Sequence, residues 1–169
     1  MELLDGIKTR RSIRKYTGQV SDDQQIKTLL DAGFCAPSAR NVRPWHFIIV
    51  KDQAKLQEVS NIHPYAKMLP SAGCGIVVCG DLCSQEQEGY IAQDCSAAIE
   101  NMLLAAHGMG LGAVWLGVYP EYERSRALSG IFNIPNNVAP MGLVCVGYPA
   151  ETPDAPDRYM EANVHHENW

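Results

Sequence analysis

Four short apolar runs, separated by helical or polar stretches, constrain most strongly what this chain can fold into. They are WHFIIV at 45–50, CGIVVCGD at 74–81, AVWLGVYP at 113–120 and APMGLVCVGYP at 139–149. Such short apolar segments, bounded by turn residues and rich in β-formers, predict buried strands. Their alternation with helices indicates an α/β or α+β domain in which helices cover a central sheet.

Helical patterns occupy the intervals between these runs. We expect helices at residues 1–10, 52–61, 91–109 and 121–128. The segment 91–109 is apolar or small nearly all round, which is typical of a helix buried on most of its sides.

A further helix is expected to begin at Ser21. Its apolar residues recur at helical spacing through Ile26 and Leu29, and Pro37 ends it. Ser21 and Gln24 have the spacing of the N-cap and N3 residues of a capping box, in which each side chain satisfies a backbone N–H of the other residue.

Length and charge exclude several classes of protein. The 169 residues fit one domain, 1–169, and 46% hydrophobic residues suffice for a core. A net charge of −5 with one small basic cluster does not suit a nucleic-acid-binding protein, which usually has a basic stripe. No run approaches the roughly 18 apolar residues of a membrane span, and the N-terminus lacks the order of a signal peptide. We therefore expect a cytoplasmic protein that binds neither nucleic acid nor membrane.

The six cysteines are expected to be free thiols. Several lie within the apolar runs, where cysteine acts as a small buried hydrophobe. There is no secretory signal and no CxxC pair, and the odd spacing of Cys74 and Cys79 would place them on opposite faces of a strand. The sequence therefore predicts neither disulfides nor a metal site.

A cluster of positive charge near the N-terminus is the first candidate binding site. Arg10, Arg11, Arg14 and a lysine lie within six residues, although close like charges repel. Arg10 and Arg14 share a side in a helix or a strand; if the segment is extended, Ser12 joins them and Ile13 points to the core. Two guanidinium groups and a hydroxyl would grip one phosphate. A solvated basic turn explains this cluster, taken alone, equally well.

Other chemical motifs are absent or out of context. GMGLG at 108–112 ends a helix and precedes a strand, the reverse of the dinucleotide-binding order, so we interpret it as a helix C-cap and turn. No P-loop or GxSxG sequence occurs, and His107, at the end of an apolar helix, is better explained by a structural role. If the chain is an enzyme, a cofactor therefore supplies the chemistry.

Two further segments have features of a binding site. The polar loop PSARNVRP at 37–44 lies between a helix and a buried strand, and loops held by rigid neighbours often bind ligands. The glycine within VWLGVYP interrupts an apolar strand, which often marks close approach by a ligand or another backbone.

Four motifs stand in a fixed order along the chain: RRSIRKY, APSxxNxxPWHFIIV, DCSAAxxNxLLAAHxxGLGAVWLG and RxxxxxVHxExW. Together they resemble the nitroreductase family of FMN-dependent oxidoreductases, in particular its short members, over about Ile7 to Trp169. The resemblance implies an α+β sandwich with a central, mostly antiparallel four-stranded sheet flanked by helices.

The same resemblance implies a homodimer with two FMN sites at its interface. The partner's C-terminal arm, about residues 149–169, would add a fifth strand to the sheet. A stripe of small residues would then suit close packing between subunits; it comprises Ser96, Ala97, Ala98, Ala105 and Ala106.

Cofactor contacts follow from the resemblance by position. Contacts to the phosphate, the ribityl chain and the pyrimidine fall to Arg10, Arg11, Ser12 and Arg14, with Arg14 near N1 and O2 of the ring. The loop contributed by the partner matches Pro37, Ser38, Ala39 and Asn41. The strand end under the ring, with backbone N–H groups facing N5 and O4, matches Trp115, Leu116 and Gly117. Two further basic residues, at the pyrimidine edge and over the phosphate, match Lys67 and Arg158.

Because of three departures from larger relatives, the substrate preference of those relatives cannot be transferred to this chain. Arg43 stands where a glutamine is frequent, and Leu116 stands where some members have an acidic side chain near the nicotinamide. The connector CSQEQEG at 83–89 leaves no room for the helices that cover the pocket in those relatives.

The resemblance implies a ping-pong reaction in which NADH or NADPH reduces the flavin at N5 and leaves. An electron-poor oxidant such as a nitroaromatic or a quinone then takes its place, and no side chain is a catalytic candidate. Three alternatives remain: a non-catalytic flavin-binding or storage protein, an FMN enzyme specialised in dehalogenation or flavin breakdown, and a flavin-free protein whose arginines dock an acidic partner.

Overall fold

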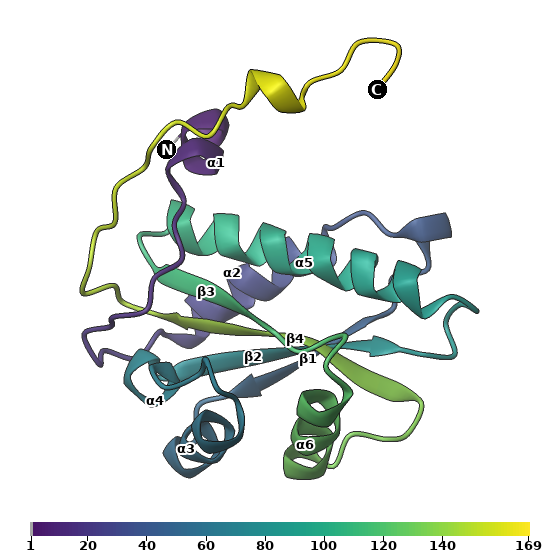
Figure 1. Cartoon of the computed structure of the whole chain (residues 1–169). Coiled ribbons are helices and arrows are strands. Elements are labelled where there is room, and N and C mark those ends of the chain that lie inside the picture. The colour runs from purple at the N-terminus through teal and green to yellow at the C-terminus, as the bar shows by residue number, and fades with distance from the viewer. Residues whose placement is uncertain (1) are drawn as a thin grey trace.

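The computed structural model describes residues 2–169 and contains one four-stranded sheet between two layers of helices (Figure 1). The strands, in sheet order β1-β2-β4-β3, are β1 (Trp45–Val50), β2 (Cys74–Asp81), β4 (Val138–Gly147) and β3 (Gly112–Gly117). All three strand pairs are antiparallel. The expected α+β class and the four-stranded antiparallel sheet are therefore confirmed.

Helices cover both faces of the sheet. One face is covered by α2 (Asp23–Phe34) and α5 (Glu88–Gly108), and the other by α3 (Gln53–Ile62), α4 (Leu69–Ala72) and α6 (Tyr122–Phe132) (Figure 1). The remaining helical segments are α1 (Leu3–Thr9) and two short 3₁₀ turns, η1 (Ala39–Asn41) and η2 (Glu161–Asn163). The sequence did not predict α4 or the 3₁₀ turns, because one turn of helix is too short to show a periodicity.

The sheet separates two apolar cores. Side chains alternate along β2, so that Ile76 and Val78 pack under α2 and α5, while Val77 and Cys79 pack against the opposite layer. Each fully buried side chain of this size contributes roughly 1.5–3 kcal/mol. Packing on both faces fixes the sheet as a rigid platform for whatever binds at its edges.

The N-terminus of α2 differs by one residue from the expected capping box. Asp22 is the N-cap; its carboxylate accepts the Gln25 N–H at 2.7 Å, and the Gln25 side chain accepts the Asp22 N–H at 3.0 Å. The sequence SDDQQ offers this spacing twice, and the Ser21–Gln24 register was wrong. Ser21 is only 1% exposed, so its side chain lies inside the protein rather than at the helix end.

Asp22→Ala should lower the free energy of unfolding by about 1 kcal/mol, because it removes the cap. Ser21→Ala is the matched control: the Ser21 hydroxyl is buried and has no hydrogen-bond partner among residues 2–169, so losing it should leave stability unchanged or slightly higher. Urea unfolding followed by circular dichroism measures both. A larger loss for the Ser21 variant would contradict this assignment of the cap.

The arginine segment, residues 10–16, runs in extended form beside the outer edge of β3. Ser12 forms a parallel bridge with Ala113, and the Ile13 N–H donates to the Ala113 carbonyl at 3.0 Å. Ile13 is buried, as the extended interpretation predicted. Within residues 2–169, this single bridge is the only β-pairing on the outer edge of β3, so the edge beyond it, at Trp115 to Gly117, is open.

The C-terminal arm, residues 149–169, leaves the sheet and passes α1 before ending away from the body (yellow in Figure 1). Its large side chains have little to pack against: Tyr159 is 68% exposed and Trp169 is fully exposed. Within the described chain it forms no strand. Pairing of the arm as a fifth strand of a partner's sheet therefore stays a prediction.

Candidate functional site

The open end of β3 presents backbone donors. The Ala113 carbonyl points outward, because it accepts the Ile13 N–H. Backbone groups of an antiparallel strand alternate between its two edges, so the N–H groups of Trp115 and Gly117 also point outward, while that of Leu116 points toward β4. The Leu116 side chain is buried in the opposite core. Two of the three N–H groups expected at this strand end therefore face the open edge.

Gly117 leaves open space at this edge, and nothing in the fold of the chain requires a glycine at this position. A Cβ atom built at Gly117 would meet no heavy atom within 4 Å, and the residue does not have a positive φ. Neither backbone strain nor packing within the chain therefore requires glycine here. The vacant volume beside two outward N–H groups suits the close approach of a flat ligand.

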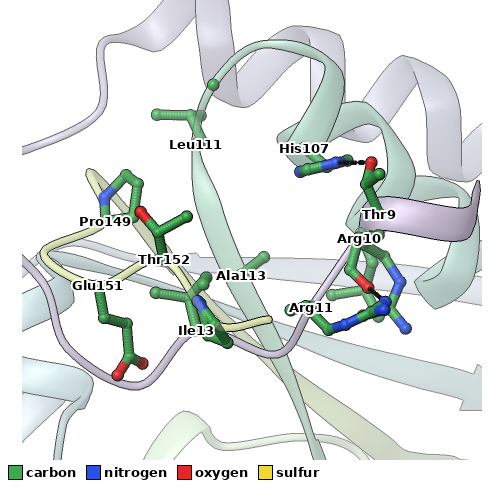
Figure 2. A pocket seen from close by; sticks show the side chains of 13 residues that line it. Thr9, Arg10, Arg11, Ile13, His107, Leu111, Ala113, Pro149, Glu151 and Thr152 are labelled. Atoms are coloured by element: carbon green, nitrogen blue, oxygen red, sulfur yellow. Dashed lines mark hydrogen bonds between the residues drawn. The ribbon is translucent and has the colours of Figure 1, made fainter. Parts of the chain in front are cut away.

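The arginine segment borders a cavity of about 270 Å³ between α1, α5 and the base of the arm (Figure 2). Arg10 and Arg11 both line it, and Arg10 forms an ion pair with Glu100 of α5 at 3.3 Å. Arg14 is exposed, with no ion pair to its side chain among residues 2–169. The Arg14 guanidinium is therefore free to meet an anion.

His107 lies in the same cavity and has a structural role, as the sequence suggested. The Thr9 hydroxyl donates to the Asp5 carbonyl at 2.6 Å, so it accepts from His107 Nε2, 2.8 Å away (Figure 2). Burial, followed by the nearby arginines, lowers the pKa of His107. A neutral imidazole therefore ties α5 to α1.

Arg11 ties the segment to the arm. Its Nε donates to the Asp154 carbonyl at 2.8 Å, and its Nη1 donates to the Lys8 and Arg10 carbonyls at 2.9 and 2.6 Å. Its Nη2 is buried without a hydrogen-bond partner within the described residues. Desolvation, then repulsion from Arg158 and Arg10, lowers the pKa of Arg11. Arg11 and Arg158 line a second cavity of about 590 Å³ together with Lys8 and one carboxylate, that of Asp157, and this excess of cations suits an anionic ligand.

Glu151 fixes the backbone of the arginine segment. One oxygen of its carboxylate accepts the Arg14 N–H at 2.6 Å and the Lys15 N–H at 3.0 Å. These bonds, chiefly that from Arg14, lower the pKa of Glu151 below its ordinary value of 4.5. The base of the arm therefore holds the segment in its extended form.

Because the folded state lowers the pKa of Glu151, its contribution to stability should be present above pH 4.5 and be lost as the pH falls through the lowered value. Glu151→Gln should therefore unfold at lower urea concentration than the unmodified chain at neutral pH, and the two should converge well below pH 4.5. A difference that persists in acid would contradict the role of the carboxylate charge.

The loop at residues 37–43 is strained and held in place from α5. Arg40, Asn41 and Arg43 have φ values of 54°, 57° and 55°, which residues other than glycine rarely adopt. The buried carboxylate of Asp94 accepts the Ala39 N–H at 2.9 Å, and the Ser38 hydroxyl accepts the Arg43 N–H at 2.9 Å. Strain of this kind clusters at ligand-binding loops. Of the predicted loop residues, Pro37 and Asn41 are exposed.

A single chain does not bring the loop and the arginine segment together. The loop is attached at Asp94, in the first third of α5, whereas the segment contacts Glu100 in the middle of the helix and α1 contacts His107 at its C-terminal end. At 1.5 Å per residue, Asp94 is about 9 Å from Glu100 and about 20 Å from His107 along the helix axis. Figure 1 shows η1 and α1 at opposite ends of α5.

Lys67 lies between α3 and α4, the helices on the face of the sheet opposite α5. Its Nζ donates to the Ser60 carbonyl at 3.1 Å, and the side chain is exposed. Nothing in the chain neutralises this charge among the described residues.

The sequence missed three residues that hold the site. Asp94 could have been found, because a carboxylate three residues from Ile91 in an apolar helix falls on the buried face. Glu151 and His63, which hold Arg14 and Gly117, gave no local signal, because their partners are distant in sequence.

Among residues 2–169, the cysteines and the acidic residues form neither a disulfide nor a metal site. All six cysteines are free, as expected, and burial raises the pKa of Cys74 to about 11 and of Cys79 and Cys95 to about 12. Within residues 2–169, no three His, Cys, Asp or Glu side chains are grouped to hold a metal ion. Over the same residues, no helix is both long and apolar enough to cross a bilayer.

Comparison with known proteins gives consistent matches over the whole chain. The model of the nitroreductase family matches residues 7–76 and 63–148. A protein of Methanothermobacter thermautotrophicus, provisionally named NADH dehydrogenase/NAD(P)H nitroreductase, is 44% identical over 100% of this chain and 88% of its own length.

Two solved structures have the same fold. One, from Parabacteroides distasonis and provisionally named NADH dehydrogenase/NAD(P)H nitroreductase, has a TM-score of 0.94 and 39% identity over 99% of this chain and 98% of its own. Another, a provisionally named nitroreductase from Desulfovibrio desulfuricans in complex with FMN, has a TM-score of 0.86 and 29% identity over 100% of this chain and 98% of its own.

Proposed function

Because the chain belongs to the nitroreductase family, we propose that it is an oxidoreductase that binds FMN at the outer edge of β3 and uses NAD(P)H as electron donor. When bound, FMN would supply the redox chemistry, with NAD(P)H as the donor in one half-reaction and an electron-poor molecule, such as a nitroaromatic or a quinone, as the acceptor in the second. The protein binds, orients and tunes the flavin. A cytoplasmic location stays a prediction.

The geometry at the edge of β3 supports this proposal most directly. Arginines lie beside Ala113, and outward N–H groups with an open space lie at Gly117, about 13 Å further along the strand. FMN has its groups in the same order, with a phosphate at one end and a flat, hydrogen-bond-accepting ring at the other. Cations and backbone donors therefore stand in the order that the cofactor requires.

Individual residues take the following roles. Contacts to the phosphate, the ribityl chain and the pyrimidine would come from Arg10, Arg11, Ser12 and Arg14, and Arg158 would close over the phosphate from the arm. Arg14 near N1 and O2 would favour the anionic reduced flavin, because positive charge stabilises negative charge that develops beside it. Lys67 would lie at the pyrimidine edge.

A second copy of the chain would complete the site, because the loop at 37–43 lies too far from the arginine segment within one chain. The exposed apolar side chains of α1 support dimerisation: Leu3, Leu4 and Ile7 are 72%, 68% and 51% exposed and no residue of α1 is buried. The arm would pass onto the partner, where the free edge of β1 can accept a fifth strand.

FMN titration of the purified protein, followed by the absorbance of the flavin, tests the proposal. We expect saturable binding of about one FMN per chain, and oxidation of NADH or NADPH when a quinone or a nitroaromatic is added. Binding without turnover of either nicotinamide would favour a flavin-storage protein. If the protein does not bind FMN, the third alternative is favoured, in which an acidic partner docks on the arginines.

A further inference from the structure

The Gly117 carbonyl is held by two side chains from the layer of helices opposite α5. It accepts a hydrogen bond from His63 Nε2 at 3.0 Å and another from Arg124 Nη1 at 3.2 Å. His63 follows α3 as its C-cap residue, and Arg124 lies in the first turn of α6. The last residue of β3 is therefore tied to two helices through one oxygen atom.

His63 is fixed in orientation and protonation. It is fully buried, and its Nδ1 accepts the Tyr65 N–H at 3.3 Å, so its proton lies on Nε2, toward Gly117. Burial lowers the pKa of His63, which keeps the imidazole neutral at neutral pH. Arg124 is half-buried, and its guanidinium lies 5.6 Å from the centre of the exposed Tyr65 ring.

The two bonds control a residue that has no side chain of its own to restrain it. Glycine rotates more freely than other residues, and Gly117 is the last residue before the chain leaves the sheet. Its carbonyl and its N–H lie on the same edge of β3. The carbonyl belongs to the Gly117–Val118 peptide, whereas the N–H belongs to the Leu116–Gly117 peptide. Holding the carbonyl therefore restricts ψ of Gly117 and restrains the residue whose N–H would face the ring, and the two donors offset the negative charge of the oxygen.

We propose that His63 is a positioning residue of the flavin site, which aims the Gly117 N–H at the flavin through its hydrogen bond to the Gly117 carbonyl. This inference rests on the proposed function. His63 does not touch the cofactor. It sets the affinity and the reduction potential of the flavin by restraining the conformation of Gly117, whose N–H meets the ring.

The direction of the expected change follows from flavin chemistry. N5 of oxidised flavin accepts a hydrogen bond, whereas N5 of reduced flavin carries a hydrogen and cannot. A well-aimed Gly117 N–H therefore stabilises the oxidised form selectively. Losing the alignment should weaken binding of oxidised FMN about tenfold and raise the two-electron midpoint potential by about 30 mV for that tenfold change.

The test compares His63→Leu, which removes the donor, with His63→Gln, whose amide can still donate to the Gly117 carbonyl. Three readouts are measured: the Kd of oxidised FMN, its midpoint potential, and the ¹⁵N–¹H signal and hydrogen exchange of the Gly117 amide without flavin. We expect His63→Leu to shift all three and His63→Gln to restore them most of the way. Arg124→Ala, which removes the other donor at the surface, should give a smaller shift in the same direction.

The outcomes separate this inference from the proposed function. If the unmodified protein binds FMN, and His63→Leu leaves its Kd, potential and Gly117 amide unchanged, His63 has no positioning role although the function stands. If the unmodified protein does not bind FMN, the proposed function is wrong. If His63→Leu does not fold, the same readouts on His63→Gln and Arg124→Ala decide, and unchanged values in the Arg124 variant would overturn the proposal.

Discussion

A chain truncated after Thr152 should fold, be monomeric in solution and lose most of its affinity for FMN. The arm beyond this point contributes no buried side chain to its own chain, so the two cores stay intact. The truncated chain would lack both the Arg158 cation and the contacts that join the partner. FMN affinity should therefore fall by more than about 100-fold, because both charged contacts and the loop of the partner are lost.

Light scattering coupled to size exclusion and FMN titration measure the two effects, with circular dichroism as the test of folding. The truncation keeps Glu151, so the arginine segment retains its backbone contacts. Arg158→Ala is the matched control: it should weaken FMN binding while leaving the dimer intact. A truncated chain that stays dimeric would contradict the exchange of the arm.

Replacing Arg14 by alanine should raise the Kd for FMN by about 10- to 100-fold, the range expected for a hydrogen bond between charged groups worth roughly 1.5–3 kcal/mol. Lys15→Ala is the control for this substitution, because the same Glu151 oxygen holds the backbone of both residues. Lys15 follows Arg14 in an extended segment and so points to the other side.

Isothermal titration of the two variants with FMN, at several salt concentrations, distinguishes contact from general attraction. The Arg14 variant should lose affinity at every salt concentration. If both variants weaken binding equally and salt removes the difference, the segment acts only through its net charge.

The sheet could be predicted from the sequence because each strand is short, apolar and bounded by turn residues. CGIVVCGD and WHFIIV match β2 and β1 residue for residue. The limits of helices were less certain: α5 begins at Glu88, three residues before the expected start, since its first turn is polar and adds no apolar periodicity. The capping box at Asp22 failed for a similar reason, because SDDQQ contains two equivalent registers.

The candidate site could be predicted only where function depends on residue type. Guanidinium groups, a glycine in a strand and a polar loop were visible in the sequence, and the extended arginine segment with Ile13 inward followed from period two. The hydrogen bonds that fix these groups join residues far apart in the chain: His63 to Gly117, Asp94 to Ala39 and Glu151 to Arg14. Local patterns contain no information about such pairs.

The central claim is that each flavin lies between the arginine segment of one chain and the loop of another. Co-expression of two differently tagged variants, Arg14→Ala and the double variant S38A/N41A, tests it after purification of the mixed dimer through both tags. Each variant alone should bind FMN weakly, whereas the mixed dimer should regain about one tight site, because a symmetric dimer then keeps one undamaged pairing of segment and loop. A mixed dimer that binds no better than either parent would contradict the account.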